Sequence, residues 1–292
     1  MSLISSPLRY PGGKANLTEY IEKVIDTNGF VDRHFVEPFA GGAAVTLFLL
    51  QRGTISSATL VERDPLVYSF WKSVFNHTDE LCDQIDQSEI NVDTWNQLIP
   101  YRNIDLPVET LVPRLGFSAL FFSRTNFSGI LKAGPIGGQT QSGKYKIDCR
   151  FNKTRLIHDI RFLSLYRDRV DVRWGDGLAF LSNNADRLAN ANSFIYIDPP
   201  YYEKGKSLYR HYFTNEQHIE LSNYLMAARY PWLLSYDNCV FINELYGPGS
   251  GNGLHARHLY FDYSVKKAKR EAELLISNVE IPPTDRSNSL IV

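Results

Sequence analysis

The segment Asp198-Pro199-Pro200-Tyr201 carries the residue types in this 292-residue chain that are best suited to chemistry. It follows residues 194–197, a short apolar run typical of a buried strand, and open α/β sheets bind ligands beyond the carboxyl ends of their strands. The prolines fix the backbone and lack N–H donors, so their carbonyl oxygens are left as acceptors. This set suits a planar base with an amino group, which would donate to Asp198 and a proline carbonyl while its ring stacks on Tyr201.

A second candidate site is the turn Glu37-Pro38-Phe39-Ala40-Gly41-Gly42, which lies between a predicted strand and a predicted helix. Glycines in such a turn let the backbone approach a ligand closely and let the helix N-terminus face it. Glu62 ends the next predicted strand, where an acidic side chain commonly binds ribose hydroxyls. A surface carboxylate is the alternative for Glu62 alone, but the turn and the acid together predict an adenosine-containing cofactor.

A third segment, Arg9-Tyr10-Pro11-Gly12-Gly13-Lys14, has the glycines and lysine of a phosphate-binding loop but not its pattern. A Walker A loop follows a strand and has Ser or Thr directly after its lysine. Here Ala15 follows Lys14, and no strand is predicted upstream. Gly143-Lys144-Tyr145 fails the same test, so phosphoryl transfer is not predicted.

Strands and helices alternate at both ends of the chain, which favours a parallel sheet with helices on its faces. The predicted fold class is therefore α/β. The seven predicted strands are residues 34–36, 58–61, 170–172, 194–197 and 232–235, with 258–263 and 273–277 as a terminal antiparallel pair. Helices are predicted over residues 43–51, 65–76, 153–166 and 176–181, and from the capping-box pattern at Thr214 onward.

The middle of the chain, roughly residues 78–165, interrupts this alternation. It has helical apolar spacing around residues 111–122 and a glycine-rich stretch over residues 128–146. Long loops inside compact domains are usually functional or mobile. We expect an insertion with a small, mostly helical core of its own.

Composition narrows the class of protein. The chain is 43% hydrophobic and 13% aromatic, which favours a folded globular protein over a disordered one. Its apolar runs are shorter than the roughly 18 residues that span a bilayer, and it does not begin with a signal-peptide pattern. The three cysteines lie far apart, unlike a zinc or disulfide framework. These features predict a cytoplasmic protein.

The charge is balanced overall, with 31 Lys and Arg against 32 Asp and Glu, but it is unevenly distributed. Residues 144–173 hold nine Lys or Arg and four Asp or Glu, a local net charge of +5. Such a stretch predicts a basic surface for nucleic acid. The alternative is a solvated face of mixed charge.

In their order along the chain, the three segments that contain Lys14, Gly41 and Asp198 resemble the Dam-type (alpha-class) DNA adenine-N6 methyltransferases, over nearly the whole sequence. The resemblance implies a seven-stranded Rossmann-like methyltransferase sheet from residues 1–77 and 166–292, and a mostly helical target-recognition insertion from residues 78–165. It implies S-adenosylmethionine as methyl donor, S-adenosylhomocysteine as product, no metal, and double-stranded DNA as substrate in a prokaryotic or phage setting. It leaves open whether a cognate restriction endonuclease is a partner.

The resemblance also implies roles for individual residues. The catalytic residues would be Asp198, Pro199, Pro200 and Tyr201. The cofactor would be bound by Tyr10 and Lys14, by Glu37, Phe39, Ala40, Gly41 and Gly42 toward its methionine end, by Glu62 or its rival Asp64 at the ribose, by Asp176 near the adenine, and by Asp198. A helix N-cap is the alternative role for Asp176. DNA would be contacted by Arg124, Asn126, Lys132, Lys144, Lys146, Arg150, Asn152 and Arg155.

The best-known members of this family read GATC through a loop that ends in a basic-aromatic-Asn trio. The corresponding residues 128–134 keep Lys132 but lack the trio. The resemblance therefore extends to DNA as the substrate but not to GATC as the target.

The implied reaction transfers a methyl group to N6 of an adenine, which must be flipped because enzymes cannot reach it inside a duplex. Asp198 and the Pro199 carbonyl would bind the amine hydrogens and stabilise the positive charge that develops on the nitrogen. The alternatives are the same chemistry on RNA or on a glutamine amide, a small-molecule methyltransferase, and a non-catalytic nucleic-acid-binding module on the same scaffold. The N-terminal Pro-Gly-Gly-Lys segment together with Asp-Pro-Pro-Tyr favours DNA.

Overall fold

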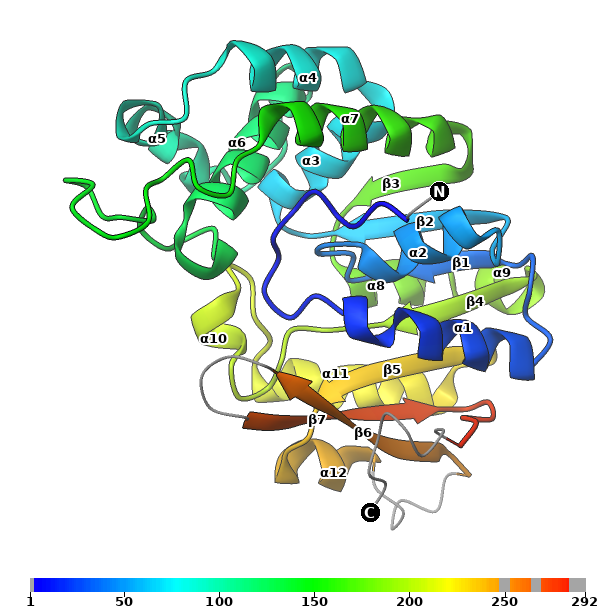
Figure 1. The fold of residues 1–292 in the computed structure, drawn as a ribbon. Coiled ribbons are helices and arrows are strands. Elements are labelled where there is room, and N and C mark those ends of the chain that lie inside the picture. Colours follow the sequence, from blue (N-terminus) through cyan, green and yellow to red (C-terminus); the bar gives the residue numbers. More distant parts are fainter. Residues whose placement is uncertain (1–2, 247–252, 264–268, 284–292) are drawn as a thin grey trace.

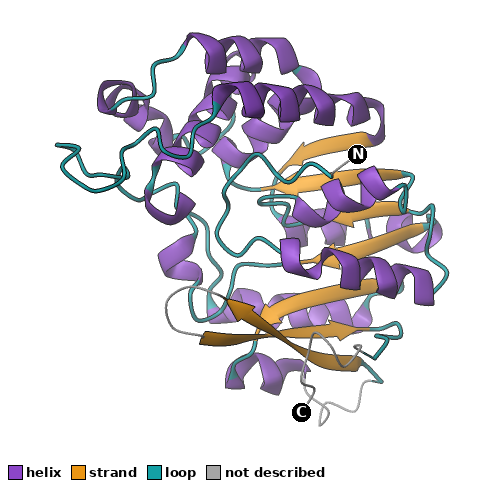
Figure 2. Ribbon diagram, in the orientation of Figure 1, coloured by secondary structure: helices purple, strands orange, loops and turns teal. Residues whose placement is uncertain are grey.

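A seven-stranded sheet forms one part of the molecule, and a group of helices lies beyond one edge of it (Figures 1 and 2). The computed structural model describes residues 3–246, 253–263 and 269–283, with 261–263 and 269–272 described as backbone only. The strands are β1 His34–Glu37, β2 Ser57–Glu62, β3 Val170–Trp174, β4 Ser193–Ile197, β5 Trp232–Asp237, β6 His255–Tyr263 and β7 Lys269–Ser277. All seven predicted strands are confirmed.

The order of the strands across the sheet is β3-β2-β1-β4-β5-β7-β6. The first five strands are parallel to one another. Strand β7 runs antiparallel to both β5 and β6, as predicted for the terminal pair. The chain runs from β1 outward to β3 and then returns to place β4 on the other side of β1. Ligands in open α/β sheets bind at such a reversal of strand order, so the ends of β1 and β4 are the expected place for a site.

Helices cover both faces of the sheet, and alternate residues of each strand point to opposite faces. Phe35 and Phe194 pack with α1 Thr18–Thr27, α2 Ala44–Arg52 and α3 Pro65–Asn76. Val36 and Ile195 pack on the other face with α8 Gly177–Asn183, α11 Asn215–Ala227 and α12 Val240–Tyr246. Figure 1 shows α1 and α2 in front of the sheet and α8 and α11 behind it. The short helices α9 Ala185–Asn190 and α10 Gly205–Leu208 and the 3₁₀ turn η1 Ala15–Leu17 complete this part.

Several predicted helix boundaries are confirmed to within a residue or two. The capping box at Thr214 is present, with its side chain accepting from the Gln217 backbone and the Gln217 side chain accepting in return. The helix predicted over residues 43–51 begins at Ala44, because Ala43 has a left-handed φ of +47° that a helix cannot continue through. Among the described residues, no helix is long and apolar enough to cross a membrane.

The middle of the chain is helical, as predicted. It comprises α4 Thr78–Gln87, α5 Val92–Leu98, α6 Val112–Thr125 and α7 Lys153–Leu163, with 3₁₀ turns η2 Ile99–Asn103, η3 Glu109–Leu111, η4 Phe127–Gly129 and, after α7, η5 Ser164–Arg169. The prediction that this segment has a core of its own is wrong. Buried Phe117 and Phe121 of α6 belong to the same hydrophobic cluster as Phe70 of α3 and the front of the sheet.

The close approach of α6 to α3 explains this shared core. Gly116 has no side chain, and a Cβ there would lie 2.7 Å from the Ser69 carbonyl oxygen. The two helices can therefore pack with their backbones nearly in contact. The division of the chain at residues 78 and 165 stays a prediction about function, since the packing continues across it.

Candidate active site

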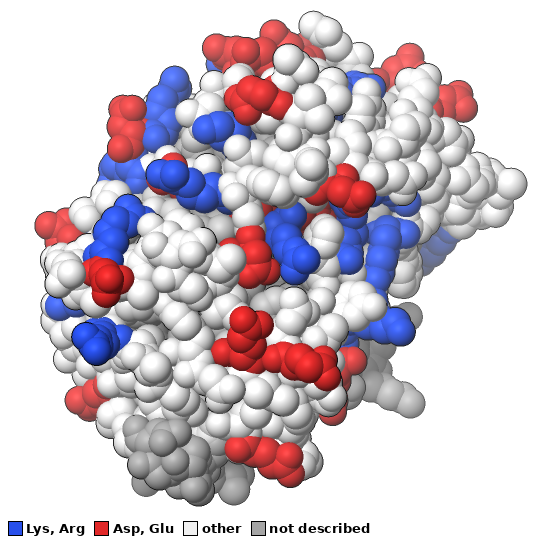
Figure 3. Space-filling model, turned by 180° about the vertical axis from the view of Figure 1, so that it is seen from behind, with Lys and Arg blue, Asp and Glu red and all other residues white. Residues whose placement is uncertain are grey.

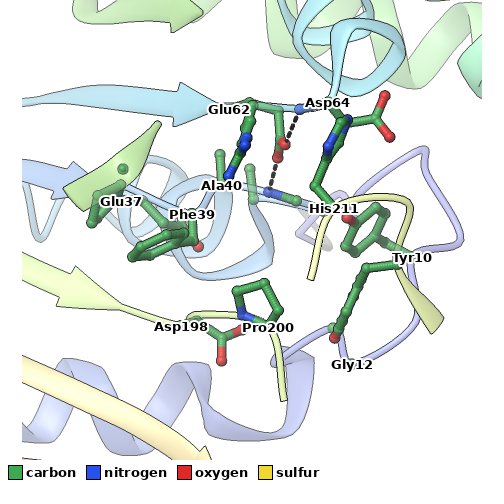
Figure 4. A pocket seen from close by; sticks show the side chains of 18 of the residues that line it. Tyr10, Gly12, Glu37, Phe39, Ala40, Glu62, Asp64, Asp198, Pro200 and His211 are labelled. Carbon is green, nitrogen blue, oxygen red and sulfur yellow. Dashed lines mark hydrogen bonds between the residues drawn. The ribbon is translucent and has the colours of Figure 1, made fainter. Parts of the chain in front are cut away.

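An open pocket lies at the carboxyl ends of β1, β2 and β4, where strand order reverses (Figure 4). It encloses about 830 Å³, part of which is continuous with solvent. Every residue predicted to bind the cofactor lines it: Tyr10, Lys14, Glu37, Phe39, Ala40, Gly41, Gly42, Glu62, Asp64, Asp176 and Asp198. Residues from the N-terminal segment, the ends of β1 and β2 and the segment after β4 thus meet around one space.

The turn after β1 needs glycine because a tyrosine ring lies directly on it. Gly41 has a left-handed φ of +44°, and a Cβ there would lie 2.7 Å from Cε1 of Tyr10. Trp71 of α3 donates a hydrogen bond to the Gly41 carbonyl at 2.8 Å and so holds the turn in place. At this point the ring of Tyr10 therefore packs directly against the backbone of the pocket wall.

Glu62 holds this turn in place. Its two carboxylate oxygens accept the backbone N–H groups of Gly41 and Asp64, each at 2.8 Å (dashed in Figure 4). Burial raises the pKa of Glu62 to about 7, although these hydrogen bonds work in the opposite direction. A carboxylate oxygen can accept a second hydrogen bond, so ribose binding by Glu62 stays a prediction beside its observed structural role.

Asp64 caps α3 and forms a buried ion pair. Its Oδ1 accepts the Leu66 backbone N–H at 2.9 Å and Nη1 of Arg210 at 3.0 Å. Asp176 likewise caps α8 by accepting from Ala179 at 3.0 Å, while its other oxygen lies 3.3 Å from Arg63. The N-cap alternative for Asp176 is thus confirmed, and the residue also lines the pocket.

Glu37 ends β1 as a buried acid with one polar partner among the described residues. The Thr46 hydroxyl donates to Oε2 of Glu37 at 2.6 Å. Burial raises the pKa of Glu37 to about 8. A cationic group bound nearby would lower this pKa and favour the ionised form of Glu37.

Asp198 lies just beyond β4 with one oxygen held by the protein. Its Oδ1 is 2.6 Å from Nζ of Lys14 and accepts the Ser235 hydroxyl at 2.9 Å. Within the described part of the chain, no donor is placed on Oδ2. Burial raises the pKa of Asp198, and Lys14 and Ser235 oppose that shift. The carboxylate is thus fixed in orientation while Oδ2 stays available to a ligand.

The ammonium of Lys14 contacts mainly residues of the catalytic segment, although Lys14 also lines the pocket. Only 6% of it is exposed, and besides Asp198 it donates to the Tyr201 hydroxyl at 3.0 Å and to the Gly12 carbonyl at 3.2 Å. Burial lowers the pKa of Lys14, but Asp198 and Glu273 outweigh it and leave the pKa well above its usual value. Tyr201 in turn donates to Glu273 at 2.7 Å. Of the two prolines, Pro199 is buried and Pro200 lines the pocket.

The segment after the catalytic motif supplies pocket residues that the sequence analysis missed. Tyr209, Arg210, His211 and Phe213 line the pocket. The ring of Tyr209 stacks on Tyr10 with centroids 5.9 Å apart, and Arg210 joins Asp64 to the Ile104 carbonyl of the middle segment. The aromatic and basic run of residues 209–213 so soon after Tyr201 was the signal that could have identified them.

Other supporting residues had weaker signals. Asp237, at the end of β5, accepts the backbone N–H groups of Tyr202 and Glu203, both at 2.9 Å. Ser235 and Glu273 reach the site from strands that are distant in sequence from Asp198. Among the described residues, no group of three or more His, Cys, Asp or Glu side chains is arranged to hold a metal ion.

The eight residues predicted to contact DNA lie in different settings. Lys144 and Arg150 are exposed, and neither forms an ion pair with any described residue. Lys132 donates to the carbonyls of Lys206 and Tyr209, at 2.6 and 3.0 Å, and so ties the middle segment to the segment after the catalytic motif. Lys146 donates to the Gln141 carbonyl.

The remaining candidates are partly used within the protein. Asn152 caps α7 by accepting the Arg155 backbone N–H at 3.0 Å, and Arg155 pairs with Asp159 at 2.8 Å. Arg124 donates to the Pro7 carbonyl at 2.6 Å, and burial lowers the pKa of its guanidinium to about 10. These contacts leave their exposed parts free to face DNA but add a structural role.

The prediction that Asn126 contacts DNA is wrong. It is fully buried, accepts Nε1 of Trp95 at 2.7 Å, and donates to the carbonyls of Ile130 and Leu131 at 3.0 Å. An amide whose donors are used inside the core cannot reach a base. Asn126 shapes the loop over residues 127–135 instead of contacting DNA.

Part of the positive charge of residues 144–173 is paired with acids at the protein surface. Arg161 pairs with Asp79 at 2.9 Å and Arg173 with Asp171 at 2.6 Å. On the face opposite that of Figure 1, basic and acidic side chains lie interspersed (Figure 3). This part of the basic stretch fits the alternative of a mixed-charge surface.

Comparison with known proteins gives the family. Residues 10–260 match the family model of the D12 class N6 adenine-specific DNA methyltransferases. The chain is 22% identical over 245 residues to the type II methyltransferase M.CviBI of Paramecium bursaria Chlorella virus NC1A, which covers 82% of this chain and 85% of the relative. It is 23% identical over 297 residues to the type II methyltransferase M.MjaIII of Methanocaldococcus jannaschii, covering 93% and 98%. The match extends over the N-terminal segment, the turn after β1 and the motif after β4, and the chain therefore belongs to the D12 class of N6 adenine-specific DNA methyltransferases.

Proposed function

We propose that this methyltransferase binds S-adenosylmethionine in the pocket and transfers its methyl group to N6 of an adenine that has been flipped out of duplex DNA. The adjacency of β1 and β4 carries the proposal, because the register Val36↔Ile195 brings the turn after β1 and Asp198 to the same pocket. A direct transfer needs its donor and acceptor held side by side in this way.

The residues around the pocket fit this cofactor. Glu37 and Glu62 are buried acceptors suited to amino and hydroxyl groups, and the turn with Gly41 lines the pocket beside them. Tyr10, Phe39 and Phe213 offer apolar faces for an adenine ring. When bound, S-adenosylmethionine supplies a methyl group already activated by its positively charged sulfur. We assign its methionine end to the turn after β1, its ribose to Glu62 and its adenine to the side of Asp176.

Asp198 would hold the target amine. Lys14 and Ser235 fix Oδ1, so that Oδ2 can accept one amine hydrogen while the Pro199 carbonyl accepts the other. These acceptors localise the nitrogen lone pair and stabilise the positive charge that develops on it. The ring of Tyr201, whose one face carries Lys14 at 4.5 Å from the ring centroid, would stack on the flipped base with its other face.

The DNA backbone would be bound by a group of arginines near the N-terminal segment. Burial and then the charge of Arg150 lower the pKa of Arg9, and burial and then Arg9 lower that of Arg124. Like charges gathered with little compensation favour a polyanion. We propose that Arg150 and Lys144 bind phosphates, because both are exposed and unpaired within the described residues.

The Arg150→Ala variant tests this assignment. We expect weaker binding to duplex DNA of any sequence, and a slope of log K against log salt that is smaller by about 1. Fluorescence anisotropy at several salt concentrations measures both quantities. Arg161→Ala is the matched control because Arg161 is paired with Asp79. An equal loss in both variants would contradict a specific phosphate contact at Arg150.

The substrate is tested by transfer of a tritiated methyl group to duplex DNA and to RNA of the same sequence. We expect incorporation into duplex DNA and recovery of N6-methyladenine from the digested product. Incorporation into RNA alone, or none despite cofactor binding by calorimetry, would overturn the proposal.

We place the enzyme in the cytoplasm of a prokaryotic or phage-infected cell. The names of both relatives support pairing with a cognate restriction endonuclease, against which the methylated DNA should be resistant.

A further inference from the structure

Strand β7 contributes a buried carboxylate that the mechanism above leaves unused. Glu273 pairs through its backbone with Asp237 of β5, and only 9% of it is exposed. Its Oε1 accepts the Tyr201 hydroxyl at 2.7 Å, whereas Oε2 is buried without a partner among the described residues. A carboxylate so far removed from water is costly unless a nearby cation compensates it. Its position therefore needs an explanation.

The compensating cation is Lys14. Its ammonium lies 2.6 Å from Asp198 and donates to the Tyr201 hydroxyl at 3.0 Å, and that hydroxyl donates onward to Glu273. The half-buried Asp198 and the buried Glu273 thus share one ammonium, Asp198 directly and Glu273 through Tyr201. Burial raises the pKa of Glu273, and the charge of Lys14 acts against it.

We propose that Glu273 is a positioning residue for methyl transfer, which rests on the proposed role of Asp198. It fixes the ring of Tyr201 through the hydroxyl, and it draws part of the charge of Lys14 away from Asp198. Asp198 then keeps enough acceptor strength to hold the target amine and to receive its proton. The transfer forms a bond between N6 and the methyl carbon and breaks the bond from that carbon to sulfur. One N6 proton leaves and passes to Oδ2 of Asp198.

The direction of the electrostatic effect follows from the groups around the two acids. Glu273 is faced by Lys14 from the N-terminal segment, by Tyr201 and Asp198 from the segment after β4, and by Asp237 from β5. Asp198 is faced by Lys14 from the N-terminal segment, by Asp237 from β5 and by the acid Glu37 from β1, and it lies near Tyr196 of β4. Removing the negative charge of Glu273 leaves Lys14 more fully paired with Asp198. The pKa of Asp198 then falls, and the acidic limb of the rate profile moves to lower pH.

The Glu273→Gln variant tests this inference because glutamine keeps an acceptor for the Tyr201 hydroxyl but removes the charge. We expect the single-turnover rate constant for methylation at neutral pH to fall by about tenfold. We expect its acidic limb to move down by about one pH unit. Equilibrium binding of cofactor and of DNA should stay within about twofold of the unmodified enzyme. Glu22→Gln is the matched control. Glu22 is a partly buried acid of α1 that lies away from the site and accepts hydrogen bonds from Arg52 and Thr54.

The Glu273→Asp variant covers the case in which the amide variant does not fold. It keeps the charge, so its acidic limb should stay in place even where its rate constant is lower. A lower rate with an unmoved limb in Glu273→Gln would reduce the residue to a structural role and overturn the inference, as would an unchanged rate and limb. Full activity in Asp198→Ala would instead refute the proposed function, so the two failures are distinguishable.

Discussion

Replacing Asp198 with alanine is expected to lower methyl transfer to adenine by at least about 10³-fold while leaving duplex DNA binding nearly unchanged. The variant loses the acceptor that orients the amine and stabilises the charge developing on N6. Single-turnover incorporation of a labelled methyl group measures the first effect. Fluorescence anisotropy with labelled duplex measures the second.

Two further variants separate the causes of that loss. Asp198→Asn keeps the shape and one acceptor oxygen, so activity above that of the alanine variant would measure the hydrogen bond apart from the charge. Asp171→Ala is the control for removal of an acid, because Asp171 pairs with Arg173 on the exposed surface of β3. Undiminished turnover in Asp198→Ala would show that the motif after β4 does not hold the reacting amine.

Replacing Lys14 with methionine is expected to reduce the free energy of unfolding by about 3–5 kcal/mol, the usual result of removing one partner from a buried ion pair. Lys14 is 6% exposed and is the cation placed between Asp198 and Glu273. Without it, the half-buried Asp198 and the buried Glu273 have no compensating cation among the described residues. Urea unfolding followed by circular dichroism measures the loss.

The loss in Lys14→Met should depend on pH. Burial already raises the pKa of Asp198 and of Glu273, and removing the ammonium raises both further. An acid whose pKa is higher in the folded than in the unfolded state loses stability as pH rises through that interval. The deficit should therefore be smaller at acidic pH, where both acids are protonated in the folded state, and larger at neutral and alkaline pH.

The double variant Lys14→Met/Asp198→Asn is the control for this prediction. It removes one of the two negative charges that the single variant leaves without Lys14, so part of the stability should return. A deficit of the same size at both pH values, with no recovery in the double variant, would place the role of Lys14 in packing and not in charge compensation.

The sequence predicted the centre of the site well because its key residues follow strands directly. Asp198 comes straight after a five-residue buried strand, and the turn with Gly41 follows β1. When both strands are parallel and adjacent, their ends must meet at one edge of the sheet. The order of β1 and β4 was the single structural fact needed to bring the two motifs together.

The contacts that complete the site could not be predicted in this way. Tyr201 and Glu273 are 72 residues apart, and their hydrogen bond depends on the antiparallel register of β7 against β5. Arg210 reaches Asp64 only because the segment after the motif folds back over the pocket. Asn126 had the polarity of a DNA ligand, and only the packing of Trp95 against it shows that it belongs to the core. Polarity indicates what a side chain can bind but not which neighbours the fold brings to it.

The absence of a boundary in the core between α3 and α6 limits how DNA specificity could be re-engineered in this enzyme. A chimera that exchanges residues 78–165 for those of a relative would graft a foreign α6 onto the native α3, where Gly116 allows no side chain beside Ser69. The transplant should therefore extend back to residue 65 and carry both helices. The ends of β1 and β4 lie outside that cassette, but Trp71, which holds the turn at Gly41, lies inside it, so the transplanted α3 must keep a tryptophan at that position.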